Sequence, residues 1–229
     1  MSDSGGWLVL LGGGEFSFGE TADADRAWLE KCPPGPVGFV PAASGSVDYG
    51  HHFTEYLREA FGREVEVVPV YRVRDGRRGK NAERIAAVAA VYLGGGVADQ
   101  LLEAVALTPV HEALTAKLAG GGVVVAIAAA AQACGAAVRS IGGRGVVDGL
   151  GLAPGLAIET NFDPAHDRRL RQLLGRPGVE RGIGLTAGSA LMIGADGRFE
   201  AVGEVFALAS ADSDLVPLVG EEPPAEAGG

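Results

Sequence analysis

The sequence predicts an α/β fold: a three-layer α/β/α sandwich on a mostly parallel sheet, with a mixed β extension on its C-terminal side. Short apolar runs alternate with longer amphipathic segments as far as Gly142, which is typical of a parallel sheet covered by helices on both faces. Gly and other small residues follow several of these runs, where a strand turns sharply into a helix. The 229 residues, 47% of them hydrophobic, suffice for one large core.

Five strands are expected before Gly142, because each of these runs is short, apolar and bounded by turn residues. They are Trp7–Leu11, Val37–Pro41, Val65–Val70, Ala90–Leu93 and Val123–Ile127. Between and after them, apolar positions recur with the period of a helix. The expected helices are Ala22–Lys31, His51–Phe61, Ala82–Ala89, Val97–Ala104, Val110–Ala119 and Ala129–Val138.

The pattern changes after Gly142, where Gly, Pro and short β-like runs dominate. Strands are expected at Leu156–Thr160, Ser189–Ile193 and Phe199–Leu208, with one helix at His166–Leu174. The run Ala195-Asp-Gly-Arg198 predicts a hairpin turn. We expect one domain over residues 1–210 and a flexible tail over residues 211–229, since the tail is rich in Asp, Glu, Pro and Gly.

Composition disfavours several classes of protein. A net charge of −10 and a pI near 4.9 argue against a nucleic-acid-binding surface and against an anionic membrane. We interpret the basic cluster Arg72–Lys80 as a solvated loop rather than an anion site. Cys32 and Cys134 are too few for a disulfide framework, and Cys134 is expected to be a buried thiol. Without a signal-peptide pattern or an apolar stretch near the ~20 residues that span a bilayer, a cytoplasmic location is expected.

The run Gly121-Gly-Val-Val-Val-Ala-Ile-Ala-Ala-Ala-Ala131 has the layout of a nucleophile elbow. Such an elbow is a short apolar strand, a tight turn of small residues and then a helix, and it lifts one side chain above the sheet. That side chain is a Ser or Cys in a working elbow, whereas this chain has Ala128. Because a methyl group cannot attack a carbonyl, the sequence predicts a hydrolase scaffold without its nucleophile.

Two Gly-rich runs, Gly12-Gly-Gly-Glu15 and Gly94-Gly-Gly96, follow the first and fourth expected strands. In a parallel sheet such loops share one edge with the elbow and line the ligand crevice. We therefore expect an anion-friendly ligand site built from backbone N–H groups. The expected ligand-binding residues are Gly13, Gly14, Gly95, Gly96, Ala129 and Ala130. No cofactor is expected, because both the dinucleotide fingerprint and the phosphate loop are incomplete.

The histidines do not form a metal motif. His51 and His52 are adjacent, so on a helix their side chains point about 100° apart. No His-Glu-x-x-His or Cys-x-x-Cys spacing accompanies them, and no metal site is expected. His111 is likewise interpreted as a polar residue at a helix start. His166 lies in a polar segment, and no Ser or Cys has a motif that would pair with it.

These segments, in their order and spacing, resemble the serine peptidases that include aspartyl dipeptidase (peptidase E) and cyanophycinase, relatives of the class I glutamine-amidotransferase fold. The resemblance spans roughly Trp7 to Leu208 and implies a flavodoxin-like, class I glutamine-amidotransferase-like sandwich. The segments that carry it are Val9–Glu15, Val40–Gly45, Tyr92–Gly96 with Gln100-Leu-Leu, Gly149–Gly155 and Ile158–Asp163 with Arg168-Arg-Leu.

The departures from this family fall on the chemistry. The family's Gly-x-Ser-Ala-Gly-Ala elbow reads Ala126-Ile-Ala-Ala-Ala-Ala131 here, so that the nucleophile becomes Ala128. The family's catalytic His becomes Asn161, and the acid of the peptidase E pattern falls on Gly143. Losing a triad nucleophile costs on the order of a millionfold in kcat, and losing the base as well adds little, because the pair acts as a unit.

We therefore expect a non-catalytic homologue that binds a small peptide-like or acidic ligand at the degenerate site. Two alternatives stay open. One is an active hydrolase with a relocated nucleophile: Ser44, Ser46 or Ser189 with His51 or His166. The other is a structural or assembly protein, and the resemblance is compatible with a homodimer. Also open is which of Glu15, Glu159 and Asp163 lines the crevice.

Overall fold

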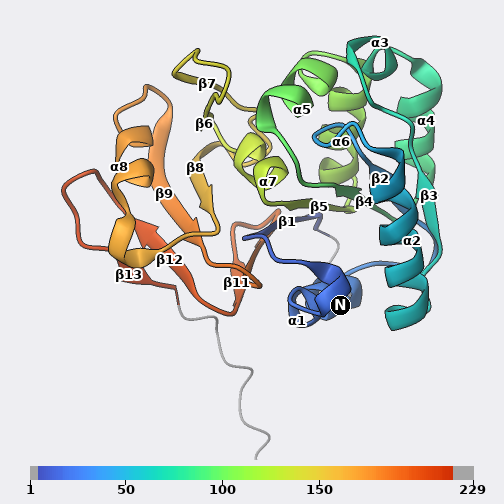
Figure 1. The fold of residues 1–229 in the computed structure, drawn as a ribbon, viewed down its shortest axis with the longest axis horizontal. Coiled ribbons are helices and arrows are strands. Elements are labelled where there is room, and N and C mark those ends of the chain that lie inside the picture. Colours follow the sequence, from blue (N-terminus) through green and yellow to red (C-terminus); the bar gives the residue numbers. More distant parts are fainter. Residues whose placement is uncertain (1–4, 219–229) are drawn as a thin grey trace, which may run out of the picture.

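The computed structural model describes residues 5–218, which form two sheets with helices packed around them (Figure 1). Sheet A has the strand order β11-β10-β1-β5-β4-β2-β3. Its parallel part consists of β1 (Trp7–Leu11), β5 (Val123–Ile127), β4 (Ala90–Leu93), β2 (Val37–Val40) and β3 (Val65–Val67). On the other side of β1, β10 (Ala190–Gly194) and β11 (Phe199–Val202) add an antiparallel edge.

Each face of sheet A packs against its own set of helices. The aromatic face, which includes Phe39 and Tyr92, is covered by α1 (Ala22–Glu30) and α2 (Val47–Phe61). The aliphatic face is covered by α4 (Gly79–Ala87), α5 (Ala98–Val105), α6 (Pro109–Ala119) and α7 (Ala129–Cys134). Strands buried on both faces need near-continuous apolar sequence, which is why β1, β4 and β5 are entirely buried.

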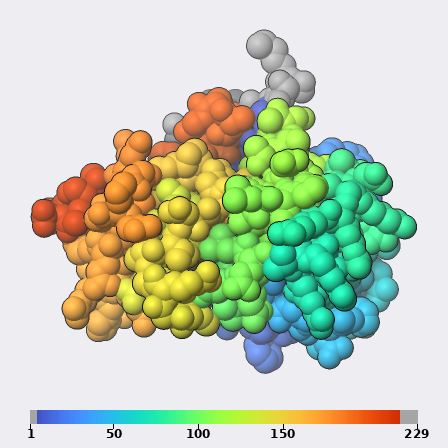
Figure 2. Space-filling model, turned by 90° about the horizontal axis from the view of Figure 1, so that it is seen from above, coloured from blue at the N-terminus to red at the C-terminus, as the bar shows by residue number. Residues whose placement is uncertain are grey.

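Sheet B, formed by the C-terminal part of the chain, is mixed. Its order is β13-β12-β9-β8-β6-β7. The strands are β6 (Ala137–Arg139), β7 (Val146–Asp148), β8 (Gly155–Thr160), β9 (Val179–Leu185), β12 (Val205–Leu208) and β13 (Val216–Pro217). Helix α8 (Arg168–Leu173) covers one face, and residues on the other face join the aliphatic core of sheet A. Figure 2 shows these strands on the opposite side of the molecule from α2 to α4.

The predicted sandwich with its mixed C-terminal extension is confirmed, and the strands β1, β4 and β5 have the predicted bounds. The predicted strand Val65–Val70 ends at Val67. Two other predicted elements were wrong in more than the position of one end. The predicted helix Ala129–Val138 ends at Cys134, because the chain turns at Gly135 and enters β6. The predicted strand Phe199–Leu208 is two strands, β11 and β12, which belong to different sheets and are separated at Gly203, whose φ is +69°.

Two observations bear on the chain's ends and on membranes. Val216 and Pro217 fall within the segment expected to be a flexible tail, yet they pair with β12 as strand β13. Residues 219–229 of that segment lie outside the described residues. Across residues 5–218, no helix has both the length and the apolar character needed to span a bilayer.

Candidate functional site

The three small-residue loops predicted to form a crevice do share one edge of sheet A. Strands β1, β5 and β4 are adjacent and parallel, so the loops that follow them leave at the same edge. The Gly95 loop and the elbow are in contact across this edge. A Cβ added to Gly95 would lie 3.6 Å from the Cβ of Ala128 and 3.5 Å from the carbonyl oxygen of Ile127.

Ala128 has the backbone geometry of a nucleophile elbow. Its φ of +53° and ψ of −121° lie in a region that L-residues rarely adopt and that costs of order 1–3 kcal/mol. Its N–H donates to the carbonyl of Leu11 at 3.0 Å, and its carbonyl accepts from Gln132 at 3.1 Å. The turn therefore joins β5 to α7 as sharply as an elbow requires, while the side chain at its tip is a half-buried methyl group.

Asn161, at the position for which the family resemblance implies the catalytic His, lies beside the same strand end. It too has a positive φ, +47°, and its N–H donates to the carbonyl of Gly12 at 2.6 Å. Its side chain packs on Gly13, where an added Cβ would lie 2.5 Å from Oδ1 of Asn161. Ala128 and Asn161 are thus held by successive carbonyls, those of Leu11 and Gly12. The structure brings together the two positions that the family resemblance implies for nucleophile and base.

The predicted backbone donors differ in availability. Within residues 5–218, the amides of Gly13, Gly14 and Gly96 donate to no protein acceptor. Ala129 and Ala130 form the first turn of α7, where N–H groups lack intrahelical partners. The Gly95 amide, in contrast, donates to the hydroxyl oxygen of Tyr49 at 3.2 Å. The backbone of Gly95 therefore lies at the site, but its N–H group is already donated to Tyr49.

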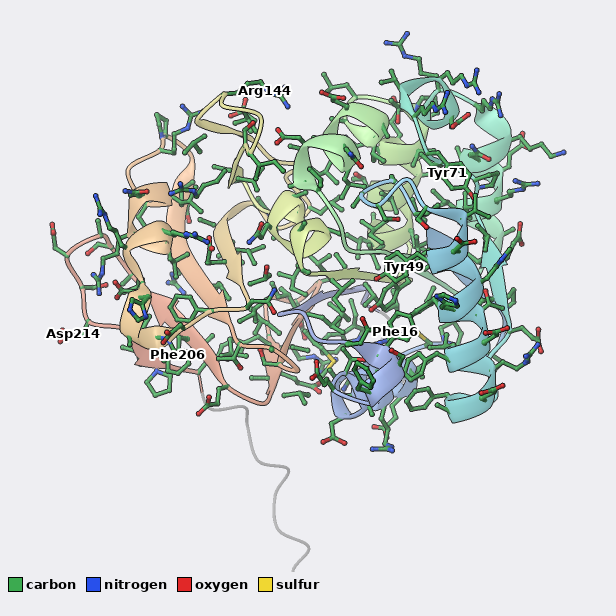
Figure 3. All side chains as sticks on the ribbon, in the orientation of Figure 1. Phe16, Tyr49, Tyr71, Arg144, Phe206 and Asp214 are labelled. Carbon is green, nitrogen blue, oxygen red and sulfur yellow. The ribbon has the colours of Figure 1, made fainter. Side chains whose placement is uncertain are left out.

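Tyr49 is a site residue that the sequence did not reveal. Helix α2 begins at Val47, four residues before the predicted start, because the Ser46 hydroxyl caps it by accepting from the Tyr49 amide. This first turn carries Tyr49 toward the Gly95 loop, and its ring stacks on Phe16 with the centroids 5.9 Å apart (Figure 3). Burial raises the pKa of Tyr49, so its hydroxyl stays protonated. The only sequence signal for this placement of Tyr49 was a capping Ser three residues before it.

The three carboxylates left open by the sequence have different surroundings. Glu15 follows Gly14 at the shared edge and accepts from the amide and hydroxyl of Ser17. Glu159 is directed toward α8, where its Oε1 lies 3.9 Å from Nη1 of Arg169, and burial raises its pKa. Asp163 accepts from the Ala165 amide and contacts His166. Of the three, Glu15 is next to the candidate site.

The candidate relocated nucleophiles are engaged elsewhere. The Ser44 and Ser189 hydroxyls donate to the carbonyls of Pro41 and Thr186, and the Ser46 hydroxyl caps α2. His166 contacts Asp163 through Nδ1 at 2.6 Å and is exposed, as is His51. In the described part of the chain, no serine hydroxyl is hydrogen-bonded to an imidazole.

Two observations concern metal-ligating side chains and the thiol of Cys134. No group of three or more His, Cys, Asp or Glu side chains between residues 5 and 218 has a metal-binding arrangement. Cys134 is fully buried, and desolvation raises the pKa of its thiol to about 12. A thiol that remains protonated at neutral pH is a poor nucleophile.

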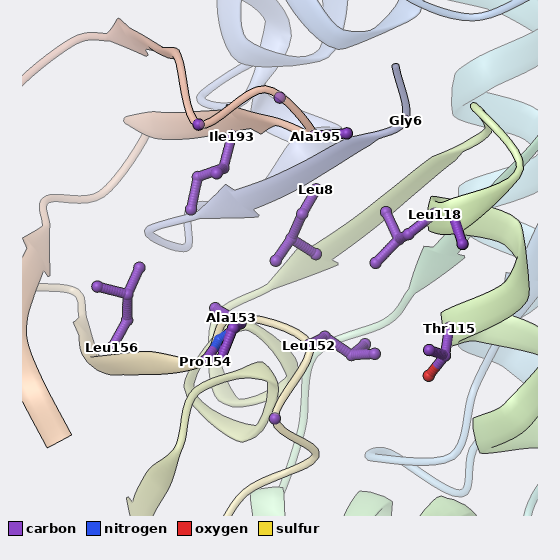
Figure 4. Close-up of a pocket in the computed structure, with 14 residues that line it drawn as sticks. Gly6, Leu8, Thr115, Leu118, Leu152, Ala153, Pro154, Leu156, Ile193 and Ala195 are labelled. Carbon is purple, nitrogen blue, oxygen red and sulfur yellow. The ribbon is translucent and has the colours of Figure 1, made fainter. Parts of the chain in front are cut away.

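An apolar cavity of ≈ 530 Å³ lies at the opposite end of β1 (Figure 4). It is lined by Leu8, Leu118, Leu152, Leu156 and Ile193, among others. Thr115 supplies its one side-chain hydroxyl, which donates to the carbonyl of His111. Since Leu8 belongs to the start of β1 and the candidate site lies beyond its end, this cavity is separate from the site.

Comparisons with known proteins agree with this architecture. The family model described as peptidase family S51 matches residues 8–200. Among solved structures, the chain is similar to a peptidase from an acI-B1 Actinobacterium, with 19% identity, 97% coverage of both chains and a TM-score of 0.75. It is also similar to a putative peptidase E protein from Listeria monocytogenes EGD-e, with 14% identity, coverage of 86% of this chain and 97% of that one, and a TM-score of 0.62. No curated protein matches the sequence.

Proposed function

This chain belongs to peptidase family S51, and we propose that it is a non-catalytic member that binds a small peptide-like or acidic ligand at the degenerate site. One observation carries the proposal. The elbow keeps its strained backbone at Ala128, and Asn161 is anchored beside it on the next carbonyl, but neither side chain can attack or take up a proton. The scaffold of the reaction is present without the groups that perform it.

The size of the catalytic loss supports an inactive protein. A triad without its nucleophile is slower on the order of a millionfold in kcat. Residual catalysis by backbone donors and binding amounts to roughly 10³–10⁴ over water, which is too slow for a metabolic hydrolase. The serine hydroxyls offered as replacements donate to backbone carbonyls instead of an imidazole. These contacts count against the alternative of a relocated nucleophile.

Ligand binding is proposed because several backbone N–H groups at the shared edge of sheet A have no protein acceptor. The amides of Gly13, Gly14 and Gly96 have no acceptor within residues 5–218, and the first turn of α7 adds two more donors. Such donors bind carboxylate or carbonyl oxygens of a peptide. Keeping Ala128 in a costly conformation also fits a surface retained for binding, since the strain serves no reaction here.

The test for activity uses the resemblance to aspartyl dipeptidase and cyanophycinase. The natural chain and an Ala128→Ser, Asn161→His double variant are incubated at high concentration with Asp-X dipeptides and with cyanophycin, and cleavage products are detected by mass spectrometry. We expect an inert natural chain. In subtilisin, losing the triad acid alone costs about 3 × 10⁴ and losing the nucleophile about 2 × 10⁶, so a variant without the acid should gain roughly 10². Turnover by the natural chain at an ordinary rate would overturn the proposal.

The test for binding compares two bulky substitutions by calorimetry with the same dipeptides. Ala128→Leu fills the space beside Gly95 and should abolish binding. Thr115→Leu is the matched control, because it enlarges a side chain in the apolar cavity at the other end of β1 and should leave binding unchanged. If both variants bind the dipeptide as the natural chain does, the ligand does not occupy the candidate site.

A further inference from the structure

The basic cluster Arg72–Lys80 contributes to a cavity in this structure. The segment holds five basic residues, Arg72, Arg74, Arg77, Arg78 and Lys80, in a chain whose net charge is −10. It forms α3 (Val73–Gly76) and the start of α4. Arg72 and Arg74 line a cavity of ≈ 470 Å³, whereas the remaining three do not line it. The cavity also involves Ser44, Gly45, Val47, Tyr71, Asp75 and Gln100.

This cavity lies on the outer side of the Gly94–Gly96 loop. Gly96 packs on the backbone of the loop after β2, because a Cβ added to it would lie 2.7 Å from the Ser44 nitrogen. Ser44 lines the cavity, and so does Gln100 in the first turn of α5, which begins just after that Gly loop. In Figure 3, Tyr71 lies beside the upper end of α2, the helix whose first turn carries Tyr49. The Gly loop of the candidate site thus packs on a segment that lines the cavity, although its three glycines do not line the cavity themselves.

The charge in the cavity is positive despite the presence of Asp75. That carboxylate is buried, with the residue 5% exposed, and its Oδ2 accepts from the amides of Tyr71 and Arg72. Its Oδ1 lies 3.3 Å from Nη1 of Arg78 and 3.8 Å from Nε of Arg74. One inward carboxylate is therefore shared by two guanidinium groups, both of which are mostly exposed.

Arg72 adds a guanidinium group that no carboxylate pairs with in residues 5–218. The Tyr71 hydroxyl and the side-chain amide of Gln100 likewise have no hydrogen-bond partner among the described residues. Two other acidic residues adjoin the lining residues without lining the cavity: Asp48 beside Val47, and Asp99 beside Gln100. The Asp99 carboxylate is paired with Arg144 at 2.6 Å. Arginine is suited to such a site because its planar fork binds two oxygens of one anion.

We propose that this cavity is an anion subsite in which Arg72 and Arg74 bind the carboxylate of an acidic ligand. The inference rests on the proposed function in one respect, namely that the carboxylate belongs to the peptide-like ligand bound across the Gly94–Gly96 loop. Anion binding itself does not depend on that assumption. The subsite favours one class of ligand. An acidic peptide is expected to bind more tightly than the same peptide with its side-chain carboxylate replaced by an amide.

The first experiment measures anion binding by the full chain at constant ionic strength. Inorganic phosphate and glutarate are titrated while amide chemical shifts are followed by NMR, and the shifts of Gly45 and Val47 report on the cavity. The Arg72→Gln, Arg74→Gln variant should raise the Kd of glutarate at least tenfold. The matched control, Arg77→Gln with Lys80→Gln, removes the same charge from the same segment outside the cavity and should change the Kd less than twofold.

The outcomes decide between a built site and general electrostatic attraction. Saturable binding with shifts at the cavity, lost only in the Arg72 and Arg74 variant, supports the subsite. Equal weakening in both variants, or shifts spread over the surface, overturns it. Tighter binding of phosphate than of glutarate would overturn the assignment to a carboxylate ligand. Thermal unfolding of each variant confirms that it is folded, and the exposure of all four side chains makes this the expected result.

A second arm separates this inference from the proposed function. Asp-Leu and Asn-Leu dipeptides are titrated into the natural chain and the Arg72→Gln, Arg74→Gln variant. A preference for Asp-Leu that the variant loses supports both. Equal binding of Asp-Leu by both proteins leaves the proposed function standing and overturns the assignment of the peptide's carboxylate to this cavity. Glutarate binding without dipeptide binding supports the anion site and overturns the peptide ligand.

Discussion

Because the backbone of Ala128 is strained, we predict that replacing it by Gly stabilises the protein, whereas an Ala→Gly substitution usually destabilises one. Ala128→Gly removes a strain of about 1–3 kcal/mol, because Gly adopts a φ of +53° without steric cost. Two effects oppose this gain in stability. The greater flexibility of Gly in the unfolded chain costs about 0.5–1 kcal/mol, and the loss of a half-buried methyl group costs less than about 0.8 kcal/mol. At the middle of these ranges the variant is more stable than the natural chain by about 0.5–1 kcal/mol.

The control is Ala130→Gly, two residues further on in α7. Ala130 is fully buried and has ordinary helical geometry, so it loses about 1 kcal/mol of helix propensity and about 0.8 kcal/mol of methyl burial. Urea unfolding should therefore separate the two variants by about 2–3 kcal/mol, and thermal unfolding by roughly 4–12 °C. Equal destabilisation by the two substitutions would refute the reasoning, since the elbow would then carry no strain.

Three further predictions follow from packing and burial. Gly13→Ala should destabilise the fold by more than Gly19→Ala, as judged by urea unfolding: both have positive φ, but only at Gly13 does an added Cβ meet Asn161, at 2.5 Å. Burial raises the pKa of Asp25, so the native state holds this proton to higher pH than the unfolded chain. Stability should fall as pH rises from about 3.9 through the native pKa, and unfolding curves of Asp25→Asn should lack that component. The buried Cys134, with its thiol pKa raised to about 12, should resist alkylation at pH 7.5 in the native state and react once unfolded in urea.

Local patterns in the sequence were sufficient to predict the sandwich and the sharp turn after β5. The apolar runs of β1, β4 and β5 show in the sequence because strands buried on both faces need continuous apolar residues. The tight turn after β5 is visible as a run of Ala, because such a turn is built from small residues. The assignment of Ala128 and Asn161 to the nucleophile and base positions is what the family resemblance implies, and it stays a prediction. Helix ends and the split of Phe199–Leu208 were less visible, because Gly135 and Gly203 act through turns that composition alone does not specify.

The sequence by itself determined which side chains this protein has at the elbow, among them the methyl group of Ala128 at the position for which the family resemblance implies a nucleophile. Only the tertiary structure decided what surrounds that position. The pairing of β5 with β1 and β4 holds Ala128 on Leu11 and places Gly95 against it. The hydroxyl of Tyr49, 46 residues from Gly95 in sequence, accepts from the Gly95 amide. The same packing turns Arg72 and Arg74 from a charged loop into one wall of a cavity beside the site. Such contacts depend on strand register and helix docking, which are set by the whole core rather than by neighbours in sequence.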